Sequence, residues 1–286
     1  MRFLRHLAAP GLAALVGVST SCTYSLELKR FHHKADTTPI GGVTFTDFRF
    51  TAKAMRPHID EYFELLVLDR SDVLQLKAIY NKVIVEDFSF FLKAAIPKMS
   101  PPYRIDYWAD HNLSGKYDGI VGGINEKDHA WRRILADPLP EDVRIVDSRY
   151  ELTFQHDTAF VDIHTDLQGN PISGAESLLP CHLSVANAGA FAGKMMELRV
   201  TDHATGRLTG FYRQGSATAD FPALITGILD EETPYDIAVY VDQNGNERYD
   251  PGEPSWATSV VSTSIGVELV LDLSSLPMGA IDTGEP

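Results

Sequence analysis

The sequence predicts an all-β protein made of two tandem antiparallel β-sandwich domains that are related by an internal repeat. Three observations lead to this prediction. Apolar and polar residues alternate in short stretches, which is typical of strands with one buried face. Turn residues separate these stretches, and no long segment has a helical period. Finally, one pattern occurs twice: YRIDYWADHNLSGKYDG begins at Tyr103, and YDIAVYVDQNGNERYDPG begins at Tyr235.

The repeat keeps four positions in register over about 132 residues, which is rare by chance. The matched residues are Tyr103, Asp110, Tyr117 and Asp118 in the first copy and Tyr235, Asp242, Tyr249 and Asp250 in the second. Upstream, residues 48–69 align with 181–202. Downstream, the runs TAFVDI, which ends at Ile163, and VELVLDL, which ends at Leu273, align as the closing strands. We therefore expect two similar sandwiches of about 100 residues, of the immunoglobulin-like or transthyretin-like kind.

The N-terminal segment has the features of a secretory signal, because Arg2 and Arg5 precede an apolar stretch from about residue 7 to 18. Its end, Val-Ser-Thr-Ser-Cys22, resembles a bacterial lipobox. That resemblance implies diacylglycerol on the Cys22 thiol and, since Thr23 follows, an outer-membrane lipoprotein facing the periplasm or the surface. The alternative is ordinary cleavage near Ser21, which leaves a free periplasmic protein.

The remaining domain limits follow from changes in composition. We expect a signal peptide with its lipobox at 1–22, a polar tether at 23–42, the first sandwich at 43–163, a Gly-Asn-Pro linker at 164–177, the second sandwich at 178–275 and a frayed tail at 276–286.

Alternation also fixes the expected faces of individual strands. Phe63, Leu65 and Val67 share one face, as do Met196, Leu198 and Val200 in the second copy. The segment RPHIDEYFELL, residues 56–66, is ambiguous between helix and strand, and its alignment with a clear strand favours a strand. Trp108 and Tyr240 take matching outward positions. Two readings of these rings stay open, namely stacking on a sugar or partner and cross-strand packing.

Charge and cysteine usage exclude several classes of protein. The formal net charge of −14 argues against a nucleic-acid partner, because phosphates would be repelled. The chain has two cysteines, and Cys181 lies in an alternating apolar run that predicts a buried, inert thiol. A Cys22–Cys181 bridge is the alternative if Cys22 is not acylated. The chain contains no nucleophile elbow, no zinc-protease motif and no phosphate-binding glycine loop, so we expect no catalysis.

Each copy carries an acidic loop after its aligned strand, with side-chain oxygens at positions one, three, five and nine. This spacing resembles calcium-binding EF-hand and dockerin-type loops. Both loops depart from that pattern, since Glu247 stands where a glycine is expected and Val121 where a bidentate Glu is expected. Plain Asx turns are the alternative. The calcium candidates are Asp110, Asn112, Ser114 and Asp118 in the first loop, and Asp242, Asn244, Asn246, Asp250 and Glu253 in the second.

Four histidines occur in the first copy and have no histidine counterpart in the second: His58, His111, His129 and His156. Converging imidazoles would suit copper or zinc, whereas scattered surface histidines would have no common role. The phrase ADHN…KYD…DHAW resembles exported bacterial β-sandwich proteins of no established activity. That resemblance implies a shape and a location but not a reaction.

Three functions are therefore open. The first is a lipid-anchored extracytoplasmic binding or structural protein, with calcium stabilising its loops. The second is a periplasmic copper- or zinc-binding protein that uses the four histidines. The third is a carbohydrate-binding accessory protein. The expected partners are the membrane, through the lipid anchor, and an unknown protein or glycan.

Overall fold

The computed structural model describes residues 45–98, 102–120, 127–165 and 178–284. These residues belong to one compact unit that spans residues 39–286. The signal segment, Cys22, the tether and residues 166–177 of the expected linker lie outside the described residues. Within the described part there is no helix with the length and apolarity needed to cross a membrane.

The first half of the chain contributes eight strands and one short 3-10 helix. They are β1 (Phe45–Lys53), η1 (Arg56–His58), β2 (Phe63–Leu68), β3 (Leu74–Asn81), β4 (Phe88–Pro97), β5 (Tyr103–Ala109), β6 (His129–Leu135), β7 (Val143–Val146) and β8 (Arg149–Gln155).

The second half contributes seven strands and a second 3-10 helix. They are β9 (Leu179–Ala186), η2 (Gly189–Phe191), β10 (Met195–Asp202), β11 (Leu208–Gln214), β12 (Phe221–Leu229), β13 (Pro234–Asp242), β14 (Ser255–Val261) and β15 (Val267–Asp272).

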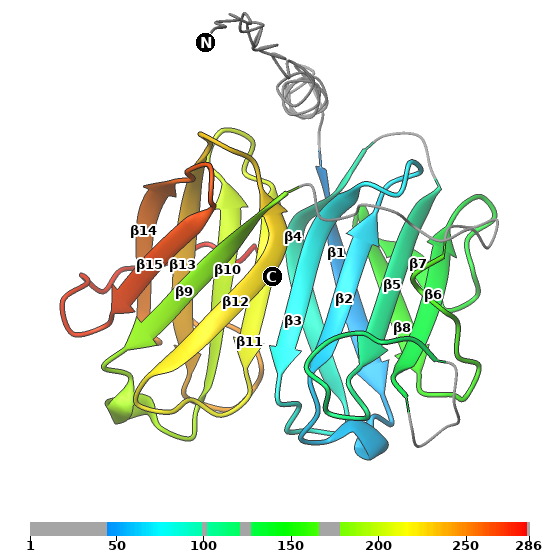
Figure 1. Cartoon of the computed structure of the whole chain (residues 1–286), viewed down its shortest axis with the longest axis horizontal. Helices are drawn as coiled ribbons and strands as arrows, with labels where there is room; N and C mark the ends of the chain where they lie inside the picture. The colour runs from blue at the N-terminus through cyan, green and yellow to red at the C-terminus, as the bar shows by residue number, and fades with distance from the viewer. Residues whose placement is uncertain (1–44, 99–101, 121–126, 166–177, 285–286) are drawn as a thin grey trace, which may run out of the picture. The chain divides into compact units, whose positions relative to one another are not determined.

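These strands form three sheets, which confirms the all-β class (Figure 1). Two small sheets have the orders β4-β1-β8-β7 and β12-β9-β15, and an eight-stranded sheet has the order β14-β13-β10-β11-β3-β2-β5-β6. Most neighbouring strands are antiparallel, as expected. Three parallel pairs were not predicted: β1 with β8, β9 with β15, and β3 with β11.

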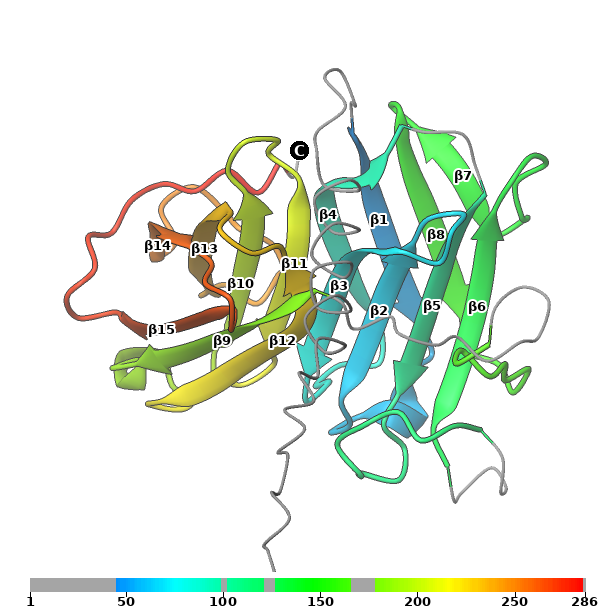
Figure 2. The same cartoon turned by 45° about the horizontal axis from the view of Figure 1, so that its top comes forward.

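The two small sheets cover opposite faces of the eight-stranded sheet, as the register of β3 and β11 shows. Ala78 pairs with Phe211, and both side chains belong to the core under β4-β1-β8-β7. The next pair, Ile79 with Tyr212, belongs to the core under β12-β9-β15. Paired residues of neighbouring strands point to the same face, and successive residues point to opposite faces. Figure 2 shows the same layers from a second direction.

The expected inner faces are buried, although β5 and β11 are buried on both faces. Phe63, Leu65 and Val67 are fully buried in the first core, and Met196 and Leu198 are fully buried in the second. Burying a side chain of this size contributes about 1.5–3 kcal/mol, so the two cores supply much of the stability of the fold.

Two expected strands are wrong in detail. Arg56–His58 form a 3-10 helix instead of a strand, because Pro57 lacks the backbone N–H that a strand pairing needs and Asp60 has a positive φ of 72°. Residues 158–163 form no strand either. In the first half β8 pairs in parallel with β1, just as β15 pairs in parallel with β9 in the second half. Residue Val161 instead donates its backbone N–H to the Ala130 carbonyl of β6.

The C-terminal tail is not frayed over its described residues. Leu276 packs against the second core, and Thr283 is buried. The Arg199 guanidinium donates to the Thr283 carbonyl at 3.2 Å, and Lys93 pairs with Asp282. Polar partners on two strands therefore hold the tail in place. The limits of the two sandwich domains remain a prediction, since β3 and β11 share backbone hydrogen bonds across the expected boundary.

Candidate metal centre

All four histidines of the first copy meet at one end of the first sandwich. His58 lies in η1, His111 follows β5, His129 begins β6 and His156 follows β8. The antiparallel pairing of Ala109 with His129 brings the end of β5 to the start of β6. The His156 N–H donates to the Lys53 carbonyl at the end of β1, just before η1. The strand directions alone thus gather four imidazoles that are far apart in the sequence.

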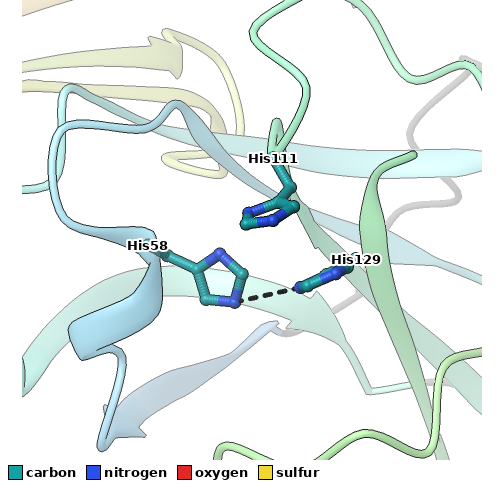
Figure 3. A group of neighbouring side chains, drawn as sticks. All are labelled: His58, His111 and His129. Atoms are coloured by element: carbon teal, nitrogen blue, oxygen red, sulfur yellow. Dashed lines mark hydrogen bonds between the residues drawn. The ribbon is translucent and has the colours of Figure 1, made fainter. Parts of the chain in front are cut away.

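The ring nitrogens face one another at short distances. His58 Nε2 lies 3.1 Å from His156 Nε2 and 3.5 Å from His129 Nδ1. One ring nitrogen from each of His58, His111 and His129 falls within 4.8 Å of the others. Figure 3 shows these three rings side by side, with the contact between His58 and His129 drawn as a dashed line, and the His111 ring stacks on His129 at 4.2 Å. Tetrahedral metal–nitrogen bonds of about 2.0–2.1 Å would place ligand nitrogens about 3.3–3.4 Å apart, so the two separations from His58 Nε2 are close to the spacing of metal ligands.

A buried carboxylate orients two of the rings. Glu61 accepts a hydrogen bond from His58 Nδ1 at 2.7 Å and from His111 Nδ1 at 2.8 Å. A carboxylate only accepts, so both Nδ1 atoms carry the proton and both Nε2 atoms carry a lone pair in the neutral ring. Carboxylate–histidine pairs of this kind orient ligands around protein-bound metals. Sequence reasoning missed Glu61, although its place three residues after His58 was a usable signal.

Aromatic rings line the cluster on two sides. The Trp131 ring lies 5.7 Å from His58 and 5.6 Å from His156, and its Nε1 donates to Asp157. Phe160 stacks on His129 at 4.1 Å. His58 is 0% and His129 5% exposed, while His111 and His156 are half-buried. Solvent therefore reaches the cluster from the side of His111 and His156.

Burial also changes the proton affinity of the cluster. It lowers the pKa of His156, and the nearby His58 lowers it further. A neutral imidazole is the form that binds a metal ion. The adjacent Asp128 has a pKa raised to about 6, mainly by burial and then by the charges of Asp118 and Asp110.

The first acidic loop forms a tight turn around Asp110. Its two carboxylate oxygens accept the N–H groups of Ser114 at 2.9 Å and Gly115 at 2.8 Å. The Asn112 amide donates to Asp118, which lowers the pKa of that carboxyl group. The Ser114 hydroxyl donates to the Lys116 carbonyl. Each predicted calcium candidate of this loop thus has a partner within the turn.

The second loop repeats this arrangement around Asp242, whose oxygens accept the N–H groups of Gly245 at 2.7 Å and Glu247 at 2.8 Å. Glu247 takes the left-handed conformation of Gly115, with φ of 62° against 77°. The amides of Asn244 and Asn246 both donate to Asp250 at 2.6 Å and lower its pKa. The remaining candidate, Glu253, accepts backbone N–H groups from Gln243 and Asp250.

Other candidate residues lie in the interior. Trp108 and Tyr240 are 3% and 1% exposed, and they pack against Tyr117 and Tyr249 respectively. Neither ring offers a free face to a sugar. Cys181 is fully buried, and burial raises the pKa of its thiol to about 12, as expected of an inert cysteine.

No protein family model matches this chain, and no curated protein matches it. Two solved structures are distantly similar. The tip fimbrial protein Mfa3 from Porphyromonas gingivalis, truncated at its C-terminus, has 9% identity and a TM-score of 0.22 over 78% of this chain and 79% of its own. A C-terminal fragment of the pilus adhesin SpaC from Lactobacillus rhamnosus GG has 10% identity and a TM-score of 0.18 over 82% and 86%. At such TM-scores neither similarity carries an argument about function.

Proposed function

We propose that this chain is an extracytoplasmic metal-binding protein that holds one zinc or copper ion between His58, His111, His129 and His156. The observation that carries the proposal is the convergence of His58, His111 and His129, with one ring nitrogen of each within 4.8 Å of the others, and the approach of His156 Nε2 to His58 Nε2 at 3.1 Å. Imidazole nitrogen suits both metals. Glu61 supports the assignment, because it accepts from Nδ1 of His58 and of His111 and so leaves the Nε2 lone pair of each ring for a metal ion.

The ligand set favours binding over catalysis. Catalytic zinc sites usually have three protein ligands and leave the fourth position to water, whereas closed sites have four. Four histidines would close the tetrahedron around the ion. Trp131 and Phe160 would keep bulk water from two sides of it. We therefore assign storage, transfer or structural stabilisation by the metal to this protein, without a reaction at the metal.

The proposed location rests on the N-terminal segment. Its lipobox resemblance supports a location outside the cytoplasm, with attachment through Cys22 to the outer membrane. Diacylglycerol with an added acyl chain gives a stable anchor, whereas a single chain does not. We expect Cys22→Ala to move the protein from the membrane fraction to the soluble fraction. A variant that stays with the membrane would contradict the anchor.

Titration of the metal-free chain tests the proposed centre. Isothermal titration with zinc, and separately with copper(II), is expected to give one ion per chain. At a hundredfold excess over the dissociation constant, binding to the folded state adds roughly 2.7 kcal/mol of stability. Trp131 provides an independent signal, because its ring lies beside His58 and its fluorescence should change in step with binding. A chain that takes up neither ion would refute the proposal.

Calcium binding by the second loop is a separate proposal, supported by the two amides that meet Asp250. Rotation of each amide by half a turn would place its oxygen, in place of its nitrogen, beside that carboxylate, which is the environment calcium requires. We expect calcium to raise the melting temperature and Asp250→Asn to remove most of that increase. Equal calorimetric scans in calcium and in chelator would leave both loops as ordinary Asx turns.

A further inference from the structure

The two halves of the chain differ at one sheet edge. In the first half β7 pairs with β8 and ends the order β4-β1-β8-β7. In the second half the order β12-β9-β15 ends at β15, and no described strand pairs with its other edge. The cause is the length of the connection. Residues 136–148 join β6 to β8 and include β7, whereas only residues 262–266 join β14 to β15.

The strand registers identify equivalent residues at this edge. Phe48 of β1 pairs with Tyr150, and the aligned Cys181 of β9 pairs with Val267. One step further, Glu151 of β8 is therefore equivalent to Glu268 of β15. Two steps further, Leu152 is equivalent to Leu269. The acidic residue and the leucine occur in both halves.

In the first half, strand β7 covers these residues, and Arg149 of β8 also pairs with Glu151 at 2.9 Å. Arg144 lies directly opposite Glu151 and forms an ion pair with it at 2.9 Å. Glu151 is 7% exposed, and Leu152 is fully buried.

In the second half no described strand covers the equivalent residues, Glu268 and Leu269. Glu268 is exposed, and no described residue forms an ion pair with it. Leu269 is only partly buried, although it packs against the second core. Val270 and Ile265 beside them are 64% and 71% exposed. The second half thus retains the contact residues of a fourth strand without the strand.

We propose that the free edge of β15 binds an extended segment of a separate protein as an antiparallel fourth strand. An open edge offers a row of backbone N–H and C=O groups, which supplies affinity. The equivalent strand β7 specifies the occupant: a basic residue opposite Glu268, as Arg144 lies opposite Glu151, with apolar residues on both sides.

A second copy of this chain is a poorer occupant. Antiparallel pairing of β15 with itself about Val270 would place Glu268 opposite Asp272 twice. Like charges directly opposite one another destabilise a sheet.

The test uses β7 itself as the probe. A fluorescent peptide of residues 142–147, DVRIVD, and a matched peptide with Arg144→Glu are titrated into the purified chain. Cross-strand charge pairs are worth about 0.2–1 kcal/mol, so the native chain should prefer the arginine peptide by up to about fivefold. Glu268→Lys should reverse that preference. Fluorescence anisotropy measures both affinities.

A filled-edge variant provides the control. Replacing residues 262–266 with residues 136–148 supplies the fourth strand within the chain, and it should abolish peptide binding. Absence of binding to the native chain, or equal affinity for the two peptides in both the native and Glu268→Lys chains, would overturn the proposal. Sedimentation that shows self-association removed by Glu268→Lys would also overturn it, because the occupant would then be a second copy.

Discussion

Replacing Glu197 with alanine is expected to lower the free energy of unfolding by about 3–5 kcal/mol, the usual cost of leaving a buried charge without its partner. Glu197 lies on β10 and is 1% exposed. One of its oxygens accepts from Arg199 at 2.7 Å, and the other accepts from Arg213 at 2.9 Å. The substitution would remove the carboxylate shared by two buried guanidinium groups, leaving Arg199 with backbone carbonyls alone and Arg213 with Glu247 at 3.3 Å. Urea denaturation followed by circular dichroism measures the loss.

The two arginines make this an effect on the whole fold. Arg199 donates to the Phe91 carbonyl of β4 at 3.0 Å, and Arg213 lies over the Phe90 ring at 5.2 Å. Burial acts to lower the pKa of Arg213, but the surrounding negative groups, with Glu197 foremost, raise it above its ordinary value. Glu197 therefore holds cations of the second half against a strand of the first.

An exposed ion pair is the matched control for Glu197. Lys53 and Asp87 pair at 2.9 Å with side chains 43% and 50% exposed. Solvent screens an exposed pair of this kind, so Lys53→Ala should change stability little. If Glu197→Ala costs no more than Lys53→Ala, the buried network does not connect the two halves in the way described.

Replacing His58 with alanine is expected to weaken zinc binding by at least about a hundredfold. His58 Nε2 faces both His129 and His156, so its loss removes the ligand closest to the others. Even residues that only orient metal ligands are worth about 10- to 100-fold in affinity. Glu61→Gln should therefore fall in that lower range, since its amide carries no charge and its single oxygen can accept from only one of the two Nδ1–H groups. Competition with a chromogenic zinc chelator measures the affinities.

Two controls separate ligand loss from loss of the fold. His203 is 59% exposed and pairs with Asp236 in the second half, so His203→Ala should bind zinc as the native chain does. His111 is partly exposed, so His111→Ala should weaken zinc binding while it disturbs packing less than His58→Ala. If His58→Ala and His111→Ala both bind zinc with native affinity, the proposed metal centre is ruled out.

Local patterns in the sequence were enough for the strands and their buried faces. Period-two alternation depends on neighbouring residues alone, so Phe63, Leu65 and Val67 were placed correctly. The same reasoning predicted the buried Cys181, and comparison of the two copies singled out the four histidines. It failed at residues 56–62, where Pro57 and the left-handed Asp60 interrupt an apolar run. It also failed at residues 158–163, where composition resembles a strand but β8 already pairs with β1.

The sequence by itself determined an all-β chain with similar halves and a formal net charge of −14. Only the tertiary structure decided that β3 pairs in parallel with β11, that the two cores lie on opposite faces of one sheet, and that β15 has an open edge. The tertiary structure also brings the histidines together at one end of the first sandwich, where Glu61 contacts His58 and His111. The physical reason is that side-chain alternation reports which face of a strand is buried, whereas strand order, direction and partner depend on contacts between residues far apart in the chain.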